Sequence, residues 1–308
     1  MRWWHILLRP FATLQADTAD RCGAALGLLV WASGLRRRVV SGNIARSLGL
    51  GGPVRGRIAR RAYASLGANV VLLLSAPRLA QDLERRVTIL NPGWCRHLAA
   101  TTPGCIMLTL HLGCWDVAGA MVKRLFGAAQ VMAKRQRQGE EMINTLRQTL
   151  GMQVVYAGDR DRQGPVQILR GLRRGIPAGL LADQGARPPT GIAAWFLGQP
   201  CWCHAGPGFL AGRGGAPLVP GFALRRAAGR YVGLLGRPLT IRPEQQERAT
   251  QYGLDILSAL IAAFPGQYFW HHDRFKRSPV LPPRPRHPWQ DQGLGLLNAA
   301  HLPEERVP

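Results

Sequence analysis

Short apolar runs alternate with longer amphipathic stretches through the middle of the chain. The apolar runs predict strands at 86–93, 105–110, 129–134, 152–158 and 176–183. Between them, apolar residues recur at helical spacing and Gly or Pro marks the ends, which predicts helices at 117–127, 140–151 and 164–175. This alternation is typical of crossover units, in which helices cover both faces of a buried, parallel sheet.

The chain has 308 residues, enough for one large α/β domain or two small ones, and we expect one. A further helix is expected at 54–76, where Pro77 ends it. The expected fold is a single α/β domain over residues 41–278, with a largely parallel or mixed central sheet flanked by helices. The sequence shows no internal repeat, and the Pro-rich segment 279–308 is expected to be an extended or disordered tail.

Residues 1–40 form an N-terminal helical segment whose apolar stretch has two interpretations. The stretch at 22–35 is shorter than the about 20 residues that a membrane-spanning helix needs. Arginines flank it on both sides and tryptophans accompany it, which fits a segment lying in an anionic membrane interface. An ordinary core helix with a solvated basic end explains the pattern equally well. No signal peptide is evident at the start of the chain.

The charge of the chain bears on its partners rather than on its fold. The sequence contains 40 Lys and Arg residues against 17 Asp and Glu residues, a formal net charge of +23. This excess favours nucleic acid, an anionic membrane surface, or an acidic protein or substrate as partner. We expect no nucleic acid partner, because no helix-turn-helix, zinc finger or aromatic-interleaved strand pattern occurs.

Six cysteines are scattered through the chain, several of them in apolar runs, which predicts reduced thiols in a cytosolic setting. The stretch Cys201-x-Cys203-His204 could suggest a metal site. No second pair at zinc-ligand spacing accompanies it, so we expect no metal and no cofactor.

The segment HLGCWD follows the strand at 105–110 and places His111 and Asp116 at the two ends of a turn around Gly113. A strand end, a glycine turn and a helix start can fold Asp116 back toward the imidazole. One ring nitrogen would then donate to Asp116, and the other would take a proton from a hydroxyl. Apart from Cys114, no serine or cysteine nucleophile accompanies the pair, which favours direct attack by an acceptor alcohol. A purely structural histidine is the alternative.

Several further segments follow one another in a characteristic order. They are Asn43-Ile44-Ala45-Arg46, HLGCWD, Lys134-Arg135, Leu181-Ala182-Asp183-Gln184-Gly185, WFLGQPCWCHAGPGFLAGRGGAPLVPGFALR and PGQYFWHHDRFKRSP. From about residue 34 to 279, this series resembles the bacterial late acyltransferases of lipid A biosynthesis, the lauroyl/myristoyl group of the lysophospholipid acyltransferase superfamily. HLGCWD matches the superfamily motif His-x4-Asp/Glu, with Cys114 where Asn is usual, and Asp273 stands where a basic residue is more common.

The resemblance implies an O-acyltransferase with a catalytic pair in HLGCWD. His111, oriented by Asp116, would deprotonate an acceptor hydroxyl that attacks an acyl thioester. Backbone N–H groups near Gly113, or a cation, would hold the developing oxyanion.

The resemblance also implies substrate-binding residues at other strand ends. Lys134 and Arg135 would meet phosphate groups, with plain surface solvation as the alternative. Asp183, Gln184 and Gly185 would bind the acceptor or brace the histidine loop, with a polar turn as the alternative. The histidines at 271 and 272 are given no catalytic role.

The partners implied are acyl carrier protein as donor, an anionic glycolipid such as a lipid A precursor as acceptor, and the cytoplasmic face of the inner membrane as the location, held peripherally or monotopically. A basic protein suits all three. A phosphatidylinositol mannoside, another glycolipid or an aminolipid are alternative acceptors. From other classes, a nucleic-acid or membrane-surface binding protein and an inactive membrane scaffold stay as alternatives.

Overall fold

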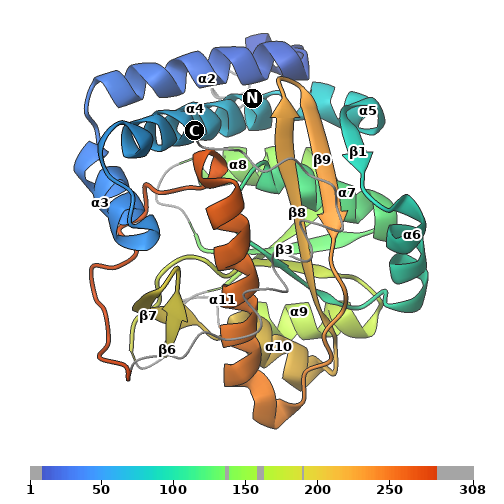
Figure 1. Ribbon diagram of the computed structural model, residues 1–308. Coiled ribbons are helices and arrows are strands. Elements are labelled where there is room, and N and C mark those ends of the chain that lie inside the picture. Colours follow the sequence, from blue (N-terminus) through green and yellow to red (C-terminus); the bar gives the residue numbers. More distant parts are fainter. Residues whose placement is uncertain (1–8, 136–138, 158–162, 189–190, 283–308) are drawn as a thin grey trace.

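The computed structural model describes residues 9–135, 139–157, 163–188 and 191–282 (Figure 1). Its strands are β1 (Val87–Ile89), β2 (Ile106–Thr109), β3 (Ala129–Ala133), β4 (Met152–Tyr156), β5 (Ala178–Leu181), β6 (Gly191–Phe196), β7 (Gln199–His204), β8 (Leu218–Ala227) and β9 (Arg230–Leu235). Seven of them form one sheet in the order β1-β9-β8-β2-β5-β3-β4, parallel except for the β8–β9 hairpin. β6 and β7 form a separate antiparallel pair.

The helices are α2 (Ala16–Ala32), α3 (Arg37–Leu48), α4 (Gly52–Leu74), α5 (Ala76–Arg86), α6 (Pro92–Thr101), α7 (Trp115–Phe126), α8 (Glu140–Thr149), α9 (Gly164–Arg173), α10 (Gly206–Gly214) and α11 (Gln246–Ala263), with short 3-10 turns η1 (Pro243–Gln245) and η2 (Pro265–Gln267). They cover both faces of the sheet, and the central strand β2 is therefore buried along its whole length. Ile106 and Leu108 pack in the cluster that includes α9, α10 and α11, while Met107 packs with α6 and α7.

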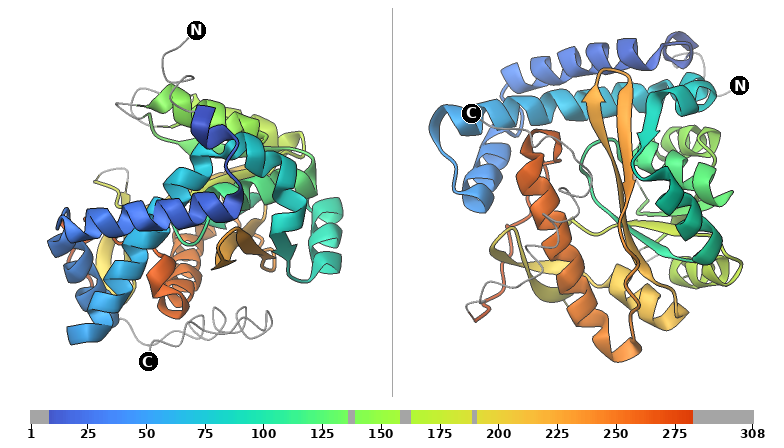
Figure 2. Two further views of the ribbon diagram at one scale, coloured as in Figure 1. Left: turned by 90° about the horizontal axis from the view of Figure 1, so that it is seen from above. Right: turned by 45° about the vertical axis from the view of Figure 1, so that its right-hand side comes forward.

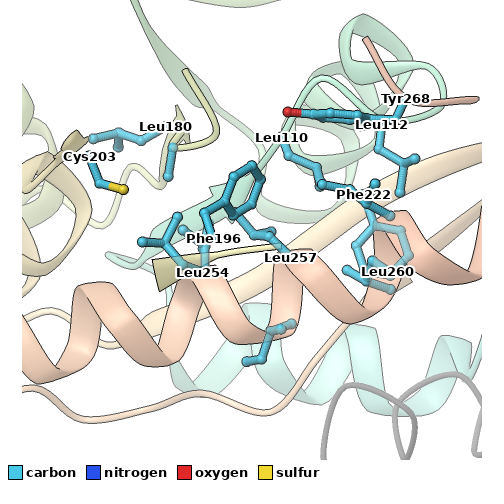
Figure 3. Close-up of a cluster of buried hydrophobic side chains, with 14 of the residues drawn as sticks. Leu110, Leu112, Leu180, Phe196, Cys203, Phe222, Leu254, Leu257, Leu260 and Tyr268 are labelled. Atoms are coloured by element: carbon cyan, nitrogen blue, oxygen red, sulfur yellow. The ribbon is translucent and has the colours of Figure 1, made fainter. Parts of the chain in front are cut away.

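The largest apolar cluster joins the sheet to α3, α4, α9, α10 and α11. Figure 3 shows Leu254, Leu257 and Leu260 of α11 beside Phe196 of β6 and Phe222 of β8. Their spacing of three residues puts these leucines on one helical face, so α11 buries a continuous apolar stripe. The β6–β7 pair is packed against α11 by this contact.

α2 and α4 lie side by side along one end of the sheet, with α2 on the outside (Figures 1 and 2). Glycines allow their backbones to approach closely. A Cβ added to Gly27 would lie 2.0 Å from the carbonyl oxygen of Tyr63, and one added to Gly67 would lie 2.1 Å from that of Gly23. Any side chain at these positions would therefore push the two helices apart.

The structure confirms the predicted α/β fold with a mostly parallel sheet flanked by helices. β1 to β5 and helices α4, α7, α8 and α9 lie where the sequence pattern places them. The pattern made no assignment for α3, α5, α6 or the elements after residue 183. The expected tail lies mainly outside the described residues, because these stop at 282.

Membrane association of the N-terminal segment stays a prediction. In the described part of the chain, no single helix combines the length and apolar composition that crossing a membrane requires. α4 and α5 satisfy those criteria only as a pair, and they are bent by 109° where they meet.

Candidate active site

The register of two neighbouring strands brings His111 and Asp183 together. β2 and β5 are parallel and pair Thr109 with Leu181. His111 and Asp183 each lie two positions beyond that pair. The ladder continues past the strands, because the N–H of Ala182 donates to the carbonyl of Thr109 at 3.1 Å. Matching positions of adjacent parallel strands lie side by side, so the two residues meet at the carboxyl edge of the sheet.

The carboxylate of Asp183 is buried and bonded to the imidazole. Nδ1 of His111 lies 2.9 Å from Oδ1 of Asp183, and the backbone N–H of His111 donates to Oδ2 at 3.2 Å. The Asp183 side chain is 1% exposed, and the hydroxyl of Tyr268 also bonds to it. Burial alone raises the pKa of Asp183, but the charge and hydrogen bonds of His111 outweigh burial and lower that pKa. Asp183 is therefore ionised at neutral pH and accepts the Nδ1 proton.

The second nitrogen of His111 lies beside the side-chain amide of Gln184. The His111 side chain is 19% exposed, and its Nε2 lies 3.4 Å from Nε2 of Gln184. The rings of Trp115 and Phe269 flank the imidazole at centroid distances of 5.2 Å and 5.7 Å. Because Nδ1 carries the proton shared with Asp183, Nε2 is the basic nitrogen. The arrangement can therefore take a proton from a group that reaches Nε2.

The turn inside HLGCWD is fixed by hydrogen bonds within the protein. Gly113 has a φ of 62°, and a Cβ there would lie 2.1 Å from the carbonyl oxygen of Ala223. The N–H of Gly113 donates to the carbonyl of Gln267 at 3.1 Å, and its own carbonyl accepts from the amide of Asn69 at 2.6 Å. The N–H of Cys114 donates to the carbonyl of Ala223 at 2.8 Å. These two N–H groups, expected to hold an oxyanion, thus have protein acceptors instead.

A buried ion pair anchors Asn69 behind this turn. The side-chain oxygen of Asn69 accepts from Nη2 of Arg225 at 2.7 Å, and Nε of Arg225 lies 3.0 Å from Oδ2 of Asp20. The same oxygen of Asp20 accepts from the hydroxyl of Tyr231 at 2.9 Å and from the N–H of Gly229 at 2.8 Å. Asp20 belongs to α2, Asn69 to α4 and Arg225 to β8, so the network ties the N-terminal helices to the HLGCWD turn.

Asp116 lies in the first turn of α7 and bonds to α8 rather than to the imidazole. Its Oδ1 accepts from Nε of Arg147 at 2.8 Å, and the two side chains are 14% and 22% exposed. Both ring nitrogens of His111 have other partners, Asp183 and Gln184. The expected contact between Asp116 and the imidazole is therefore wrong, and Asp116 contacts Arg147 instead. The physical reason is that α7 begins at Trp115, and its helical backbone turns the next side chain toward α8. A catalytic role for Asp116 stays a prediction.

Lys134 and Arg135 follow β3, which pairs with β5, so they lie at the same edge of the sheet as Asp183. Nζ of Lys134 is 3.4 Å from Nε2 of His204. Burial, and then the charge of Lys134, lower the pKa of His204 to about 4, which keeps this imidazole neutral. Nη1 of Arg135 lies 3.0 Å from Oε1 of Glu140. The structure thus links Lys134 to β7 and Arg135 to the start of α8.

Gly185 is held against the C-terminal signature segment. Its N–H donates to Nε2 of His272 at 3.2 Å, and it forms a β-bridge with Cys203. Burial, and then the charge of Arg274, lower the pKa of His272, so this imidazole is neutral and can accept. Nη1 of Arg274 donates to the carbonyl of Trp202 at 2.6 Å, and its Nη2 lies 3.0 Å from Sγ of Cys203. These contacts fix the backbone directly after β5.

The cysteines around the site are buried. Cys114 is 2% exposed, and burial raises the pKa of its thiol to about 12. A thiol that stays protonated at neutral pH is a weak nucleophile, which argues against a covalent role for Cys114. The Sγ atoms of Cys201 and Cys203 are 3.6 Å apart. Across the described ranges, no three His, Cys, Asp or Glu side chains are grouped so that they could hold a metal ion.

Several residues of the site have no role in the sequence analysis. Tyr268 and His272 lie inside PGQYFWHHDRFKRSP, so the motif itself was the available signal. Arg147, Asn69 and Arg225 occupy positions that no motif or spacing distinguishes, and only the packing of their helices and strand brings them to the HLGCWD turn and to α7.

Comparison with known proteins relates the sequence of the chain to lipid acyltransferases. A family model described as bacterial lipid A biosynthesis acyltransferase matches residues 2–277. The phosphatidylinositol mannoside acyltransferases of Mycobacterium tuberculosis strains CDC 1551 / Oshkosh and ATCC 25618 / H37Rv are each 28% identical to the chain over 149 residues. The matched stretch covers 46% of this chain and 45% of each relative, so the chain spans less than half the length of these curated relatives.

Proposed function

Because the chain belongs to the bacterial lipid A biosynthesis acyltransferase family, we propose that it transfers a fatty acyl chain from a thioester to a hydroxyl of a membrane glycolipid. The observation that carries the proposal is the partly exposed imidazole of His111, bonded at Nδ1 to the buried carboxylate of Asp183 and in contact at Nε2 only with the side-chain amide of Gln184 among the described residues. The site thus offers a positioned base beside a buried, protonated Cys114, which suits direct attack by an alcohol.

In the proposed reaction, Nε2 of His111 takes the proton of the acceptor hydroxyl while the hydroxyl oxygen attacks the thioester carbonyl carbon. Asp183 stays ionised, keeps the proton on Nδ1 and stabilises the imidazolium that forms. The tetrahedral intermediate then breaks its C–S bond, and the departing sulfur takes the proton from Nε2. The products are an ester and a free thiol, and the imidazole is neutral again.

The proposed acceptor is an anionic glycolipid such as a lipid A precursor. Phosphatidylinositol mannoside is the second candidate, supported by the names of the two relatives. The proposed donor is a thioester on an acidic acyl carrier protein, because the net charge of +23 attracts an acidic partner. Lys134, at the same sheet edge as Asp183, is the proposed contact for phosphate groups of either substrate.

The proposed location is the cytoplasmic face of the inner membrane, reached through the α2 surface. We define this surface as the large apolar side chains Leu26, Leu29, Val30, Leu35 and Val70, which are between 40% and 66% exposed. Beside it, Arg37 and Arg60 lie 5.0 Å and 6.0 Å from the ring of Trp31. Exposed apolar residues next to arginines and a tryptophan suit an anionic lipid surface.

The function is tested by incubating the purified protein with an acyl carrier protein thioester and one acceptor. The acceptor is a lipid A precursor in one reaction and a phosphatidylinositol mannoside in another. We expect a product heavier by one acyl group in mass spectrometry for one acceptor, and none with His111→Ala. An active His111→Ala protein would contradict the mechanism. Equal rates with the coenzyme A thioester at low salt would contradict the donor assignment, because the Debye length is then longer than the about 10 Å found at 0.1 M salt and charge attraction is at its strongest.

The location is tested by sedimentation with anionic vesicles. Leu29→Asp and Leu35→Asp should reduce vesicle binding by about tenfold or more, because each places a charge at the lipid interface. Val166→Asp is the matched control, since Val166 is 40% exposed on α9. Unchanged binding of both variants would show that the α2 surface does not face lipid, and release of the protein from vesicles by salt alone would leave only an electrostatic contact.

A further inference from the structure

The carboxamide of Gln184 lies at the reacting nitrogen of the site. Its Nε2 is 3.4 Å from Nε2 of His111. Since Asp183 is ionised and accepts the Nδ1 proton, Nε2 of His111 offers a lone pair. An amide nitrogen can only donate, so the contact is an N–H directed at the imidazole. Gln184 therefore points a hydrogen at the place where the acceptor hydroxyl must bind.

Five backbone N–H groups around His111 are engaged elsewhere. The N–H of His111 bonds to Asp183, that of Gly113 to Gln267 and that of Phe269 to the carbonyl of His111. The N–H groups of Cys114 and Gly185 bond to Ala223 and His272, as described above. An oxyanion next to Nε2 therefore needs a donor other than these five N–H groups.

We propose that Gln184 is a catalytic residue, and that its Nε2–H donates to the oxyanion of the tetrahedral intermediate. The proposal rests on the acyl transfer proposed above. When the acceptor hydroxyl bonds to Nε2 of His111, it displaces the amide from that nitrogen. In the tetrahedral intermediate, the attacking oxygen and the oxyanion are bonded to the same carbon. An amide displaced by the attacking oxygen therefore lies beside the oxyanion. The amide donates without losing its proton, and the charge that it stabilises disappears when the C–S bond breaks.

The backbone of Gln184 is fixed well enough for this role. Ala182 before it bonds to β2, and Gly185 after it bonds to His272 and bridges to Cys203. A Cβ at Gly185 would lie only 3.3 Å from Nη1 of Arg274 and 3.4 Å from Nε2 of His272. The backbone is thus held on both sides of Gln184, and the amide moves only by rotation of its side chain.

The proposal is tested by steady-state kinetics of Gln184→Ala and Gln184→Glu, with Gln199→Ala as control. Gln199 is an amide on β7 that donates to the carbonyl of Arg46 and lies outside the site. We expect kcat of Gln184→Ala to fall by about 10²- to 10³-fold, the loss typical of removing one oxyanion donor, with each KM changed by less than about threefold. The Gln199→Ala variant should keep the rate of the unmodified protein.

Gln184→Glu adds a signature that a structural role would not produce. An ionised Glu repels the oxyanion, whereas a protonated Glu can donate to it. The rate of Gln184→Glu relative to Gln184→Ala should therefore rise as pH falls. A kcat of Gln184→Ala within threefold of the unmodified protein, or a raised acceptor KM at constant kcat, would overturn the proposal.

A binding measurement separates this proposal from the proposed function. Calorimetry with an alkyl phosphonate, whose anionic tetrahedral centre imitates the intermediate, should show about 10²-fold weaker binding to Gln184→Ala. The neutral thioether of the same chain should bind both proteins equally. If Gln184→Ala loses affinity for both probes equally, or for neither, the oxyanion role is contradicted even if acyl transfer is observed. The phosphonate difference alone supports it even if the tested acceptors are not acylated.

Discussion

Asp183 and Asp116 are the two acids that follow a strand near His111, Asp183 after β5 and Asp116 after β2, yet their surroundings differ. Asp183 comes two residues after β5, is 1% exposed and bonds to Nδ1 of the imidazole. Asp116 comes after β2 in the same motif as His111, is 14% exposed and bonds to Arg147. The residue 72 positions away is the partner of the histidine, and the residue five positions away is not.

The difference shows that strand pairing, rather than closeness in sequence, decides which acid meets the imidazole. Adjacent parallel strands in register hold their following residues side by side, whereas a helix that starts within the motif carries its first acidic residue away from the strand end. Asp116 suits its own position, since a carboxylate in the first turn is stabilised by the positive end of α7 and by Arg147. The proposed division of work is therefore orientation by Asp183 and helix packing by Asp116.

The largest expected effect is that of Asp183→Asn. An amide at this position can present its N–H to Nδ1 and favour the wrong tautomer of His111, so we expect acyl transfer to fall by about 10³- to 10⁴-fold. His111→Ala should lose as much, and the double variant no more, because the two act as one unit. Circular dichroism melting controls for folding. A fully active Asp183→Asn protein would show that the contact in the structure has no catalytic part.

Asp116→Asn is expected to have a much smaller effect, a loss of less than about tenfold, because it loosens a partly exposed pair between α7 and α8. Arg147→Met should reproduce that loss, and the double variant should add little to it. Rates of the single and double variants test this. A loss from Asp116→Asn as severe as that from Asp183→Asn, without one from Arg147→Met, would return the orienting role to the acid of the motif.

Tyr268→Phe removes one hydrogen bond from Asp183 and leaves the ring in place. We expect kcat to fall by about fivefold, which corresponds to the about 1 kcal/mol of one hydrogen bond. The variant should melt within a few degrees of the unmodified protein. An unchanged kcat would show that His111 alone holds the carboxylate.

The smallest expected effect is on stability at acid pH. The folded-state pKa of Asp183 lies below the ordinary value of 3.8, so its ionised form stabilises the fold at any pH above about 4. That contribution is lost as pH falls below the ordinary value and through the lowered pKa. Melting temperatures between pH 7 and pH 3 should therefore drop less steeply for Asp183→Asn. Parallel melting curves for the two proteins would contradict the shift.

Local patterns were sufficient for the elements that position the site. The continuous apolar run at 105–110 predicts a strand buried on both faces, and β2 is buried throughout. The alternation of strands and helices predicts the parallel sheet, and the parallel sheet places His111 and Asp183 at one edge. The late part of the chain was harder, because β8 and β9 form an antiparallel hairpin in an otherwise parallel sheet, and β6–β7 lies apart from it.

The sequence by itself determined the histidine, its place after a buried strand, the candidate acids and the family resemblance. The tertiary structure decided which acid meets which nitrogen. That choice depends on the order and register of β2 and β5, on the start of α7 at Trp115, and on the approach of Arg147 from α8. These are contacts between segments far apart in the chain, and a local pattern carries no information about which distant segment will pack beside it.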